Sequence, residues 1–248
     1  MRGVLAAMPS SAERQRVVGQ GEGGDETTAI DAAAERVIVD RLRPLGVSIV
    51  SEEVGRIAGD STLVVLDPID GSLNAKRGIP FFSVSIAVAD GETMDDVAFG
   101  YVYDFGTGEE WTARRGEGAW LNGEPLGAEK PKDRIEILSF EATRTQLVAR
   151  DSPKVAELAH RLRLMGSLAL SLCHLAAGRV DGVCSLKPAR SVDIAAGQLL
   201  VREVGLAIAL FDDARGFGEA ELDLQGRSRV AAAGTAELCR RIGDALSA

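Results

Sequence analysis

The stretch 63–72, LVVLDPIDGS, constrains the fold more than any other part of this chain. Aliphatic residues typical of a buried strand run directly into Asp67, and Asp70 follows after Pro68 has stiffened the turn. A carboxylate is costly to bury unless a cation or a hydrogen-bond donor pairs with it. The stretch therefore predicts either a solvated turn or a binding site at the end of a strand, and the rest of the chain decides between them.

Residues 1–132 are predicted to form the first of two sub-domains, a helix followed by a largely antiparallel sheet. Apolar residues recur at helical spacing over 30–42, and Pro44 and Gly46 end the helix. The segment FGTG separates two strand-like runs and is a hairpin signal. Strand-like runs follow the helix at 47–51, 62–67, 82–89, 97–104, 109–115 and 118–126.

Residues 133–248 are predicted to form the second sub-domain, in which strands and helices alternate. In the first helix Ser152 is the cap and Pro153 takes the first helical position. The helices are predicted at 152–162, 167–178, 191–205 and 235–247, and the strands at 135–140, 161–166, 181–186, 206–211 and 228–234. This alternation indicates a layered α/β (α+β) fold.

Composition excludes several function classes. The formal charge of −9 and the pI of about 4.9 leave no basic footprint for nucleic acid. No run approaches the length of a membrane-spanning helix, so no membrane partner is predicted. The three cysteines fit no metal-ligand spacing, which predicts reduced thiols in a cytoplasmic protein, and two histidines nearly exclude a His-rich zinc site.

Carboxylates stand at the ends of four predicted elements. They are Glu52 and Glu53, Asp67 and Asp70, Asp193, and Asp25 with Asp31. Ligand sites of layered α/β proteins collect at such element ends, and oxygen-only ligands suit Mg²⁺. Each pair alone is better explained as a capped turn or a solvated acid. Together with the Gly-Ser pair after Asp70, they predict metal binding.

Gly71 and Ser72 supply the anion side of the predicted site. Glycine at a turn exposes backbone N–H groups, and a short helix starting at Ser72 would favour an anion through its dipole. A metal pair beside such a turn is the arrangement that transfers a phosphoryl group to water. Ser72 would then relay that water's proton to an acid such as Asp31. The segment 19–24, GQGEGG, matches a dinucleotide pattern, but no strand precedes it and a flexible loop is predicted.

Three segments resemble the inositol monophosphatase/fructose bisphosphatase superfamily in order and spacing: SEEVG at 51–55, VVLDPIDGSLNAKRGIPFF at 64–82 and SVDIAAG at 191–197. The sequence is most similar to the archaeal-type inositol-1-phosphatases that also act on fructose 1,6-bisphosphate. The resemblance spans residue 20 to the C-terminus. It implies a layered α-β-α-β-α fold, Mg²⁺-dependent hydrolysis of a sugar phosphate and a homodimer.

The resemblance also implies the metal ligands. Glu52, Asp67 and the carbonyl of Ile69 would hold the first Mg²⁺. Asp67, Asp70 and Asp193 would hold the second, with Asp67 bridging the two ions.

Roles for the remaining site residues follow from the same resemblance. A third, looser ion would lie near Glu52 and the GGDE segment at 23–26, called the glycine loop below, where Asp25 assists. Gly71 and Ser72 would cradle the phosphate beside Asp70, and Ser72 with Asp31 would orient the attacking water. The implied substrate contacts are Arg163, Leu168 and Lys187.

The sequence departs from its relatives in the substrate region. Lys187 stands where that branch often has arginine, and Lys and Arg are not equivalent at a bidentate phosphate site. Leu186 falls near an inositol-binding glutamate of animal-type enzymes. The predicted substrates are inositol 1-phosphate and fructose 1,6-bisphosphate. Alternatives are a 3′(2′),5′-bisphosphate nucleotidase, a histidinol-phosphate phosphatase, or a non-catalytic metal-dependent phosphosugar-binding protein.

Overall fold

The larger of two sheets has eight strands, in the order β10-β9-β8-β7-β6-β5-β3-β4. The computed structural model describes residues 2–24, 26–127, 132–141, 144–213 and 215–247. The strands are β3 (Ser48–Ser51), β4 (Gly55–Ile57), β5 (Leu63–Asp70), β6 (Ser83–Ala89), β7 (Val97–Asp104), β8 (Glu110–Arg114), β9 (Gly118–Leu121) and β10 (Glu124–Pro125). β3 and β5 run parallel and the other neighbours antiparallel, which confirms the predicted largely antiparallel sheet.

The smaller sheet has five strands, in the order β12-β11-β13-β15-β14. They are β11 (Ile135–Glu141), β12 (Ala159–Arg163), β13 (Gly182–Ser185), β14 (Ala207–Leu210) and β15 (Val230–Ala233). β11 runs parallel to both β12 and β13, whereas β15 runs antiparallel to β13 and β14. A third, two-stranded sheet pairs β1 (Val17–Gln20) with β2 (Glu26–Thr28), which sequence patterning did not predict.

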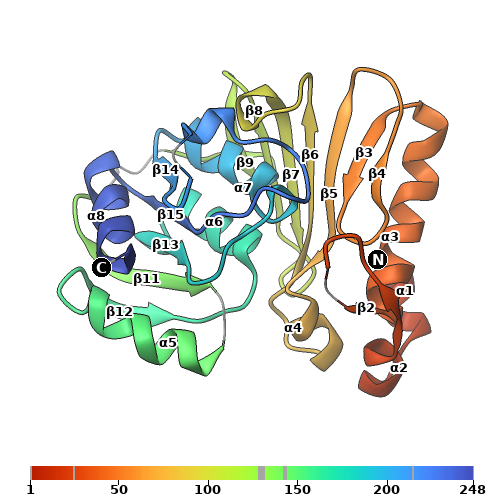
Figure 1. The fold of residues 1–248 in the computed structure, drawn as a ribbon, viewed down its shortest axis with the longest axis horizontal. Helices are drawn as coiled ribbons and strands as arrows, with labels where there is room; N and C mark the ends of the chain where they lie inside the picture. Colours follow the sequence, from red (N-terminus) through yellow and green to blue (C-terminus); the bar gives the residue numbers. More distant parts are fainter. Residues whose placement is uncertain (1, 25, 128–131, 142–143, 214, 248) are drawn as a thin grey trace.

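The helices and sheets alternate in five layers, which confirms the predicted α-β-α-β-α fold (Figure 1). From right to left in Figure 1, α3 (Ala29–Leu42) covers the larger sheet, with α1 (Arg2–Ala7) and α2 (Ser11–Gln15) against it. The middle layer holds α6 (Leu168–Ala176) and α7 (Ser191–Glu203). The last layer is α8 (Ala236–Ser247) with α5 (Thr145–Asp151) beside it.

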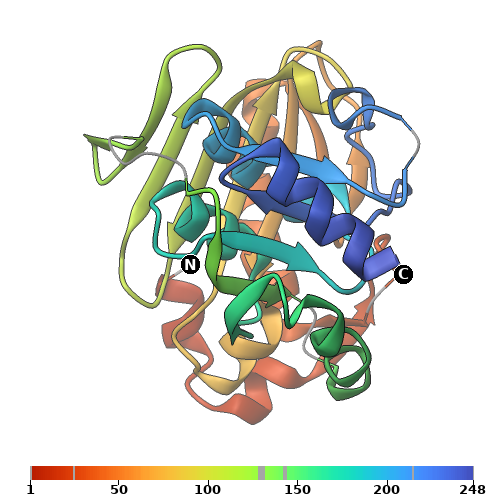
Figure 2. The same ribbon diagram turned by 90° about the vertical axis from the view of Figure 1, so that its left-hand side faces the viewer.

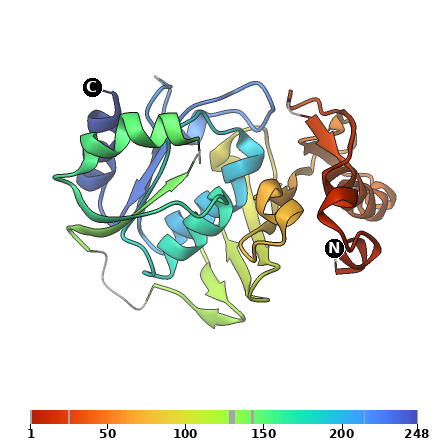
Figure 3. The ribbon, with the colours of Figure 1, turned by 90° about the horizontal axis from the view of Figure 1, so that it is seen from below.

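Two further views place the remaining elements. Figure 2 shows α8 lying across the outer face of the smaller sheet. Figure 3 shows the short helix α4 (Ser72–Arg77) between the N-terminal helices and the second half of the chain. Because α4 follows β5 directly, the C-terminal end of β5 also lies toward the second half of the chain.

One buried apolar cluster joins the two halves. It contains Val102 and Trp111 from the larger sheet, Leu172 and Leu199 from the middle helices, and Val183 from the smaller sheet. The halves therefore share a core, and the division into sub-domains at 1–132 and 133–248 stays a prediction.

The predicted helix at 152–162 is wrong. The helix α5 ends at Asp151, Ser152–Val155 form a 3₁₀ turn, and Ala159–Arg163 form strand β12. Pairing of β12 with β11 buries Ala159 against Ile135 at the edge of the sheet. Long-range strand pairing thus overrides the local helical spacing, which sequence patterning alone does not register.

Two glycines let α7 lie close to its neighbours. A Cβ on Gly100 of β7 would stand 2.8 Å from the carbonyl oxygen of Ala196, and a Cβ on Gly197 would stand 2.9 Å from Leu172 Cδ1. The first contact is with backbone, so it cannot be relieved by a change of rotamer. Gly100 therefore fixes how deeply α7 sits on the larger sheet.

We expect Gly100→Ala to lower the free energy of unfolding by about 1–3 kcal/mol, as overpacking of a core does. Gly19 in strand β1 is the matched control, since a Cβ there meets no atom within 4 Å. Gly19→Ala should leave stability unchanged or raise it slightly. Urea unfolding followed by circular dichroism measures both. Equal midpoints for the two variants would show that the close approach of α7 is not a constraint.

None of the helices among the described residues is long and apolar enough to cross a membrane.

Candidate active site

A cavity of about 340 Å³ lies where the two halves meet. Its wall brings together carboxylates from β2, α3, the turn after β3, β5, β11 and α7, which are far apart in the sequence. The acids are Glu26, Asp31, Glu52, Glu53, Asp67, Asp70, Glu141 and Asp193, and the cations are Lys76, Arg144, Lys187 and Arg190. Acids outnumber cations, so the wall of the cavity has an excess of negative charge.

The end of β5 is held by hydrogen bonds within its own turn. Asp67 Oδ1 accepts from the N–H of Ile69 at 2.9 Å, and the Ser72 hydroxyl donates to the carbonyl of Ile69 at 2.9 Å. The register with β6 shifts between Asp67 and Asp70, so the strand bulges there. Gly71 has φ of 89°, a left-handed conformation that favours glycine, and α4 starts directly after it, as predicted.

Asp70 connects the first half of the chain to α6 of the second. Its Oδ2 accepts from the hydroxyl of Ser167, the N-cap of α6, and from the N–H of Ala169 at 2.8 Å. These donors hold one oxygen of the carboxylate.

Arg190 is the cation nearest to the predicted metal ligands. Its guanidinium hydrogen-bonds to Glu52 and lies 3.6 Å from Asp193 Oδ1. The backbone N–H of Arg190 donates to Asp193 Oδ2 at 2.7 Å, and its guanidinium also donates to the carbonyl of Gly23 at 3.4 Å. One arginine therefore connects the turn after β3, the start of α7 and the glycine loop around the acids.

Burial raises the pKa of the central acids. The pKa of Asp67 lies well above its usual range, because the side chain is buried and because Glu52, Asp70 and Asp193 add negative charge. Burial likewise raises the pKa of Glu52 to about 7 and that of Asp70 to about 6, against the opposing effects of Arg190 and Ser167. Such acids favour either a proton or a metal cation as partner.

The donor set fits a divalent metal ion. Glu52, Asp67, Asp70 and Asp193 all line one cavity, and the backbone of Ile69 lies between two of them. Hard cations such as Mg²⁺ take oxygen ligands of this kind. A bound cation would offset the repulsion that raises these pKa values, so the predicted ligands and their chemistry agree.

Asp31 is bonded to residues other than the predicted Ser72. Its Oδ2 accepts from the Thr28 hydroxyl at 2.6 Å and lies 3.0 Å from Lys76 Nζ. Its Oδ1 is buried and has no hydrogen-bond partner among the described residues. The pairing of Ser72 and Asp31 through a water stays a prediction.

The other predicted residues lie in different surroundings. Leu168 and Lys187 line the cavity with Gly71 and Ser72. Arg163 is exposed, and its guanidinium donates to the carbonyl of Leu162 at 2.9 Å, so it does not belong to the cavity wall seen here. Asp25 lies outside the described residues.

Sequence reasoning missed five charged residues of the cavity wall: Glu26, Lys76, Glu141, Arg144 and Arg190. Lys76 stands four residues after Ser72, a helical spacing that puts both on one side of α4. Arg190 is the N-cap residue of α7 and lies three residues before Asp193. Glu141 ends β11, and burial raises its pKa to about 7 despite hydrogen bonds from Ser139 and Ser171.

A second group of possible metal ligands lies elsewhere. One ligand atom each of Asp104, Glu109 and His174 lies within 4.8 Å of the others. Glu109, however, forms a bidentate ion pair with Arg179 at 2.6 and 2.7 Å, and Asp104 accepts from the N–H of Gly106 at 2.7 Å. These bonds already occupy both acids, so the group is explained as a capped hairpin turn with an ion pair.

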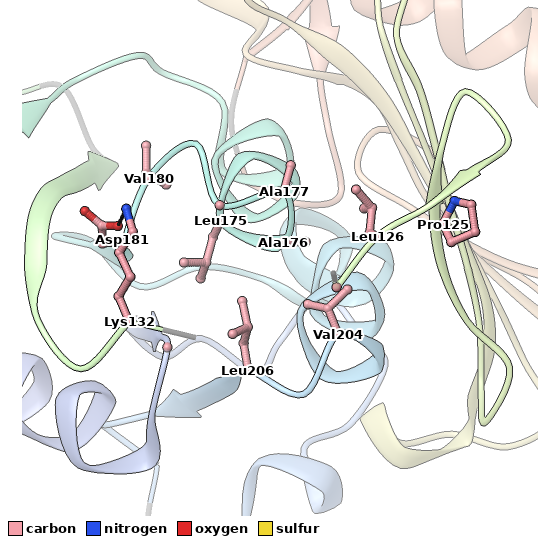
Figure 4. Close-up of a pocket in the computed structure, with 13 residues that line it drawn as sticks. Pro125, Leu126, Lys132, Leu175, Ala176, Ala177, Val180, Asp181, Val204 and Leu206 are labelled. Atoms are coloured by element: carbon pink, nitrogen blue, oxygen red, sulfur yellow. Dashed lines mark ion pairs between the residues drawn. The ribbon is translucent and has the colours of Figure 1, made fainter. Parts of the chain in front are cut away.

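A second cavity, of about 160 Å³, is shown in Figure 4. Its wall is mainly apolar, with Leu175, Val204 and Leu206 among its residues. The carboxylate of Asp181 at its end is paired with Lys132 at 2.6 Å. The described residues of this wall offer one paired acid, which does not make a metal site.

Comparison with known proteins agrees with the geometry of the acidic cavity. Residues 3–245 match the inositol monophosphatase family. A fructose-1,6-bisphosphatase/inositol-1-monophosphatase of Thermococcus kodakarensis is 36% identical over 231 residues, which are 92% of this chain and 86% of that protein. The Nus factor SuhB of Escherichia coli is 37% identical over 237 residues, 90% of this chain and 85% of that protein.

A solved structure supports the same assignment. An inositol monophosphatase-fructose 1,6 bisphosphatase aligns with a TM-score of 0.83 and 29% identity, over 98% of this chain and 95% of that one. The chain therefore belongs to the inositol monophosphatase family, a family of phosphatases.

Proposed function

We propose that the protein is a Mg²⁺-dependent phosphomonoesterase that hydrolyses inositol 1-phosphate and fructose 1,6-bisphosphate. The observation that carries the proposal is Asp67, which is 2% exposed and surrounded by like charges at the end of β5. Such a carboxylate is strongly destabilising unless it takes up a proton or a cation is bound. Gly71 and Ser72 lie beside it in the same cavity, where a phosphate would bind.

The proposed ligand assignment follows the resemblance to the family, and the presence of these residues in the wall of one cavity supports it. Glu52, Asp67 and the Ile69 carbonyl would hold one ion, and Asp67, Asp70 and Asp193 the other, with a third ion near the glycine loop. When bound, the ions would lower the pKa of the attacking water and stabilise the leaving oxygen.

The chain's own groups would position the reactants. The N–H groups at the start of α4 would bind the phosphate oxygens, and Ser72 and Asp31 would orient the water. Leu168 and Lys187 would contact the substrate, as would Arg163 after a change of side-chain conformation. We also propose that the protein is a cytoplasmic homodimer, as its resemblance implies.

The substrate preference is tested by a panel of phosphate esters assayed with Mg²⁺. The panel includes inositol 1-phosphate, fructose 1,6-bisphosphate, adenosine 3′,5′-bisphosphate and histidinol phosphate. Phosphate release from one of the last two alone would favour the corresponding alternative. Tight phosphosugar binding measured by calorimetry without turnover would favour a non-catalytic binding protein.

We expect Asp67→Asn to lower phosphate release by about 100-fold or more at saturating Mg²⁺, because the variant loses the bridging carboxylate. Asp40→Asn is the matched control, since Asp40 is exposed on α3. A steady-state phosphate assay compares the two with the wild type. Wild-type turnover by Asp67→Asn would refute the metal-activated mechanism.

The metal-free protein should lose stability as pH rises. In the folded protein the pKa of Glu52 is about 7 and that of Asp70 about 6, whereas unfolded acids titrate near about 4. The folded state therefore binds more protons between these values, so the contribution of these two acids to stability is fully present below about pH 4 and is lost as pH rises through 6 to 7.

Calorimetric melts in a chelator at about pH 5 and about pH 8 measure this fall, and Mg²⁺ should restore the Tm at the higher pH. Asp67→Asn relieves part of the repulsion and should show a smaller fall. A wild-type Tm that does not change with pH would contradict the predicted crowding of charge.

Lys187 should distinguish the two proposed substrates. It is exposed and lines both the acidic cavity and an adjoining recess that also contains Arg144 and Arg227. We expect Lys187→Met to raise KM for fructose 1,6-bisphosphate about tenfold, the value of one charge-assisted hydrogen bond. The KM for inositol 1-phosphate should change less, and Lys187→Arg should retain bisphosphate binding. Equal effects on both substrates would place Lys187 at the shared phosphate.

A further inference from the structure

Lys76 is a cation in the cavity wall to which the resemblance gives no role. It stands one helical turn after Ser72 on α4, so both side chains lie on the same side of that helix. Its Nζ is 3.0 Å from Asp31 Oδ2, and the side chains of Lys76 and Asp31 are 14% and 6% exposed. An ammonium group so nearly buried requires a carboxylate partner. The pair is therefore a fixed part of the wall.

The two oxygens of Asp31 have different surroundings. Oδ2 accepts from the Thr28 hydroxyl at 2.6 Å and from the Thr28 N–H at 3.3 Å, in addition to its contact with Lys76. Oδ1 is buried and has no partner among the described residues. A buried carboxylate oxygen without a donor is costly, so Oδ1 is the acceptor that remains for a water in the cavity.

The charges of the cavity explain why a cation is needed at this position. Arg190 lies beside Glu52 and Asp193, on the side of the predicted metal ligands. Lys76 lies beside Asp31, on the side of the predicted attacking water. Its positive charge also counteracts the rise in the pKa of Glu53. Without Lys76, the repulsion of the other acids would favour rotation of Asp31 away from the cavity.

We propose that Lys76 is a positioning residue for the attacking water. It holds Oδ2 of Asp31, so that Oδ1 accepts the hydrogen bond of the water that Ser72 also contacts. The inference rests on the proposed function, in which these two residues orient that water.

The chemical step balances without a proton from Lys76. The water oxygen forms a bond to phosphorus while one of its protons passes to Asp31 Oδ1. The bond from phosphorus to the ester oxygen breaks, and that oxygen leaves with the electron pair and takes a proton from solvent. Lys76 remains an ammonium throughout.

The test compares Lys76→Met, Lys76→Arg and the control Arg77→Met, a substitution at the exposed neighbouring position. We expect Lys76→Met to lower kcat for inositol 1-phosphate about 10-fold to 100-fold, as loss of a positioning group does, with KM within about twofold of wild type. Lys76→Arg should recover most of kcat, and Arg77→Met should behave as the wild type. An unchanged kcat in Lys76→Met, or a rise in KM alone, would overturn the inference.

A second measurement needs no turnover. Urea unfolding in a chelator is compared for Lys76→Met, Asp31→Asn and the double variant. Loss of stability in the double variant should be smaller than the sum of the single losses, because Asp31→Asn removes the charge that Lys76→Met leaves unpaired. Additive losses would show that the pair does not interact and would overturn the inference.

Two results separate this inference from the proposed function. Absence of phosphate release by the wild type on the whole panel would refute the proposed function, whatever the unfolding experiment shows. Wild-type turnover with coupling in the unfolding experiment but an unchanged kcat in Lys76→Met would leave the proposed function standing and reduce Lys76 to a structural role. Should Lys76→Met fail to fold, Lys76→Gln takes its place in both measurements.

Discussion

The crowding of carboxylates around Asp67 is the constraint on which the rest of the structure depends. Glu52, Asp70 and Asp193 line the same cavity as Asp67. Their negative charges raise the free energy that is needed to keep Asp67 ionised. Desolvating several like charges costs several kcal/mol per ion. In the metal-free molecule Arg190 offsets part of this cost through Glu52 and Asp193. The fold is thus stable enough to hold a cluster of acids that the proposed cations would neutralise.

The shared core is what keeps this arrangement rigid. Asp193 opens α7, and α7 is buried along most of its length between the two sheets. Gly100 allows it to lie within contact distance of the larger sheet. The position of one proposed metal ligand is therefore set by packing against both halves of the chain. A change in the core that moves α7 would move Asp193 relative to Asp67, although neither residue is altered.

Local patterns in the sequence were sufficient to predict β5, α3 and α7 and the acids at their ends, because each is specified by residues within one segment. The same reasoning failed at 152–162, where β12 forms by pairing with a distant strand. It also missed the contacts of Lys76 with Asp31 and of Arg190 with Glu52, partners 45 and 138 positions apart. A lone lysine or arginine carries no periodic signal, so only the folded chain shows which acid it accompanies.

Four acids of the cavity are held in the same way, by hydrogen bonds from nearby turns and helix caps and by one lysine. One oxygen of each is fixed by a donor nearby: Asp67 by the N–H of Ile69, Asp70 by the start of α6, Asp193 by the N–H of Arg190, and Asp31 by Thr28 and Lys76. The second oxygen of Asp193 lies 3.6 Å from the guanidinium of Arg190, and that of Asp31 has no hydrogen-bond partner among the described residues. The side chains are ordered before the ligand arrives, so binding has little conformational entropy to overcome. A preorganised set of this kind also needs little rearrangement as charge develops on the phosphate. The two cations therefore have different partners. Arg190 pairs with Glu52 and Asp193, which would hold metal, and Lys76 pairs with Asp31, which would receive the proton.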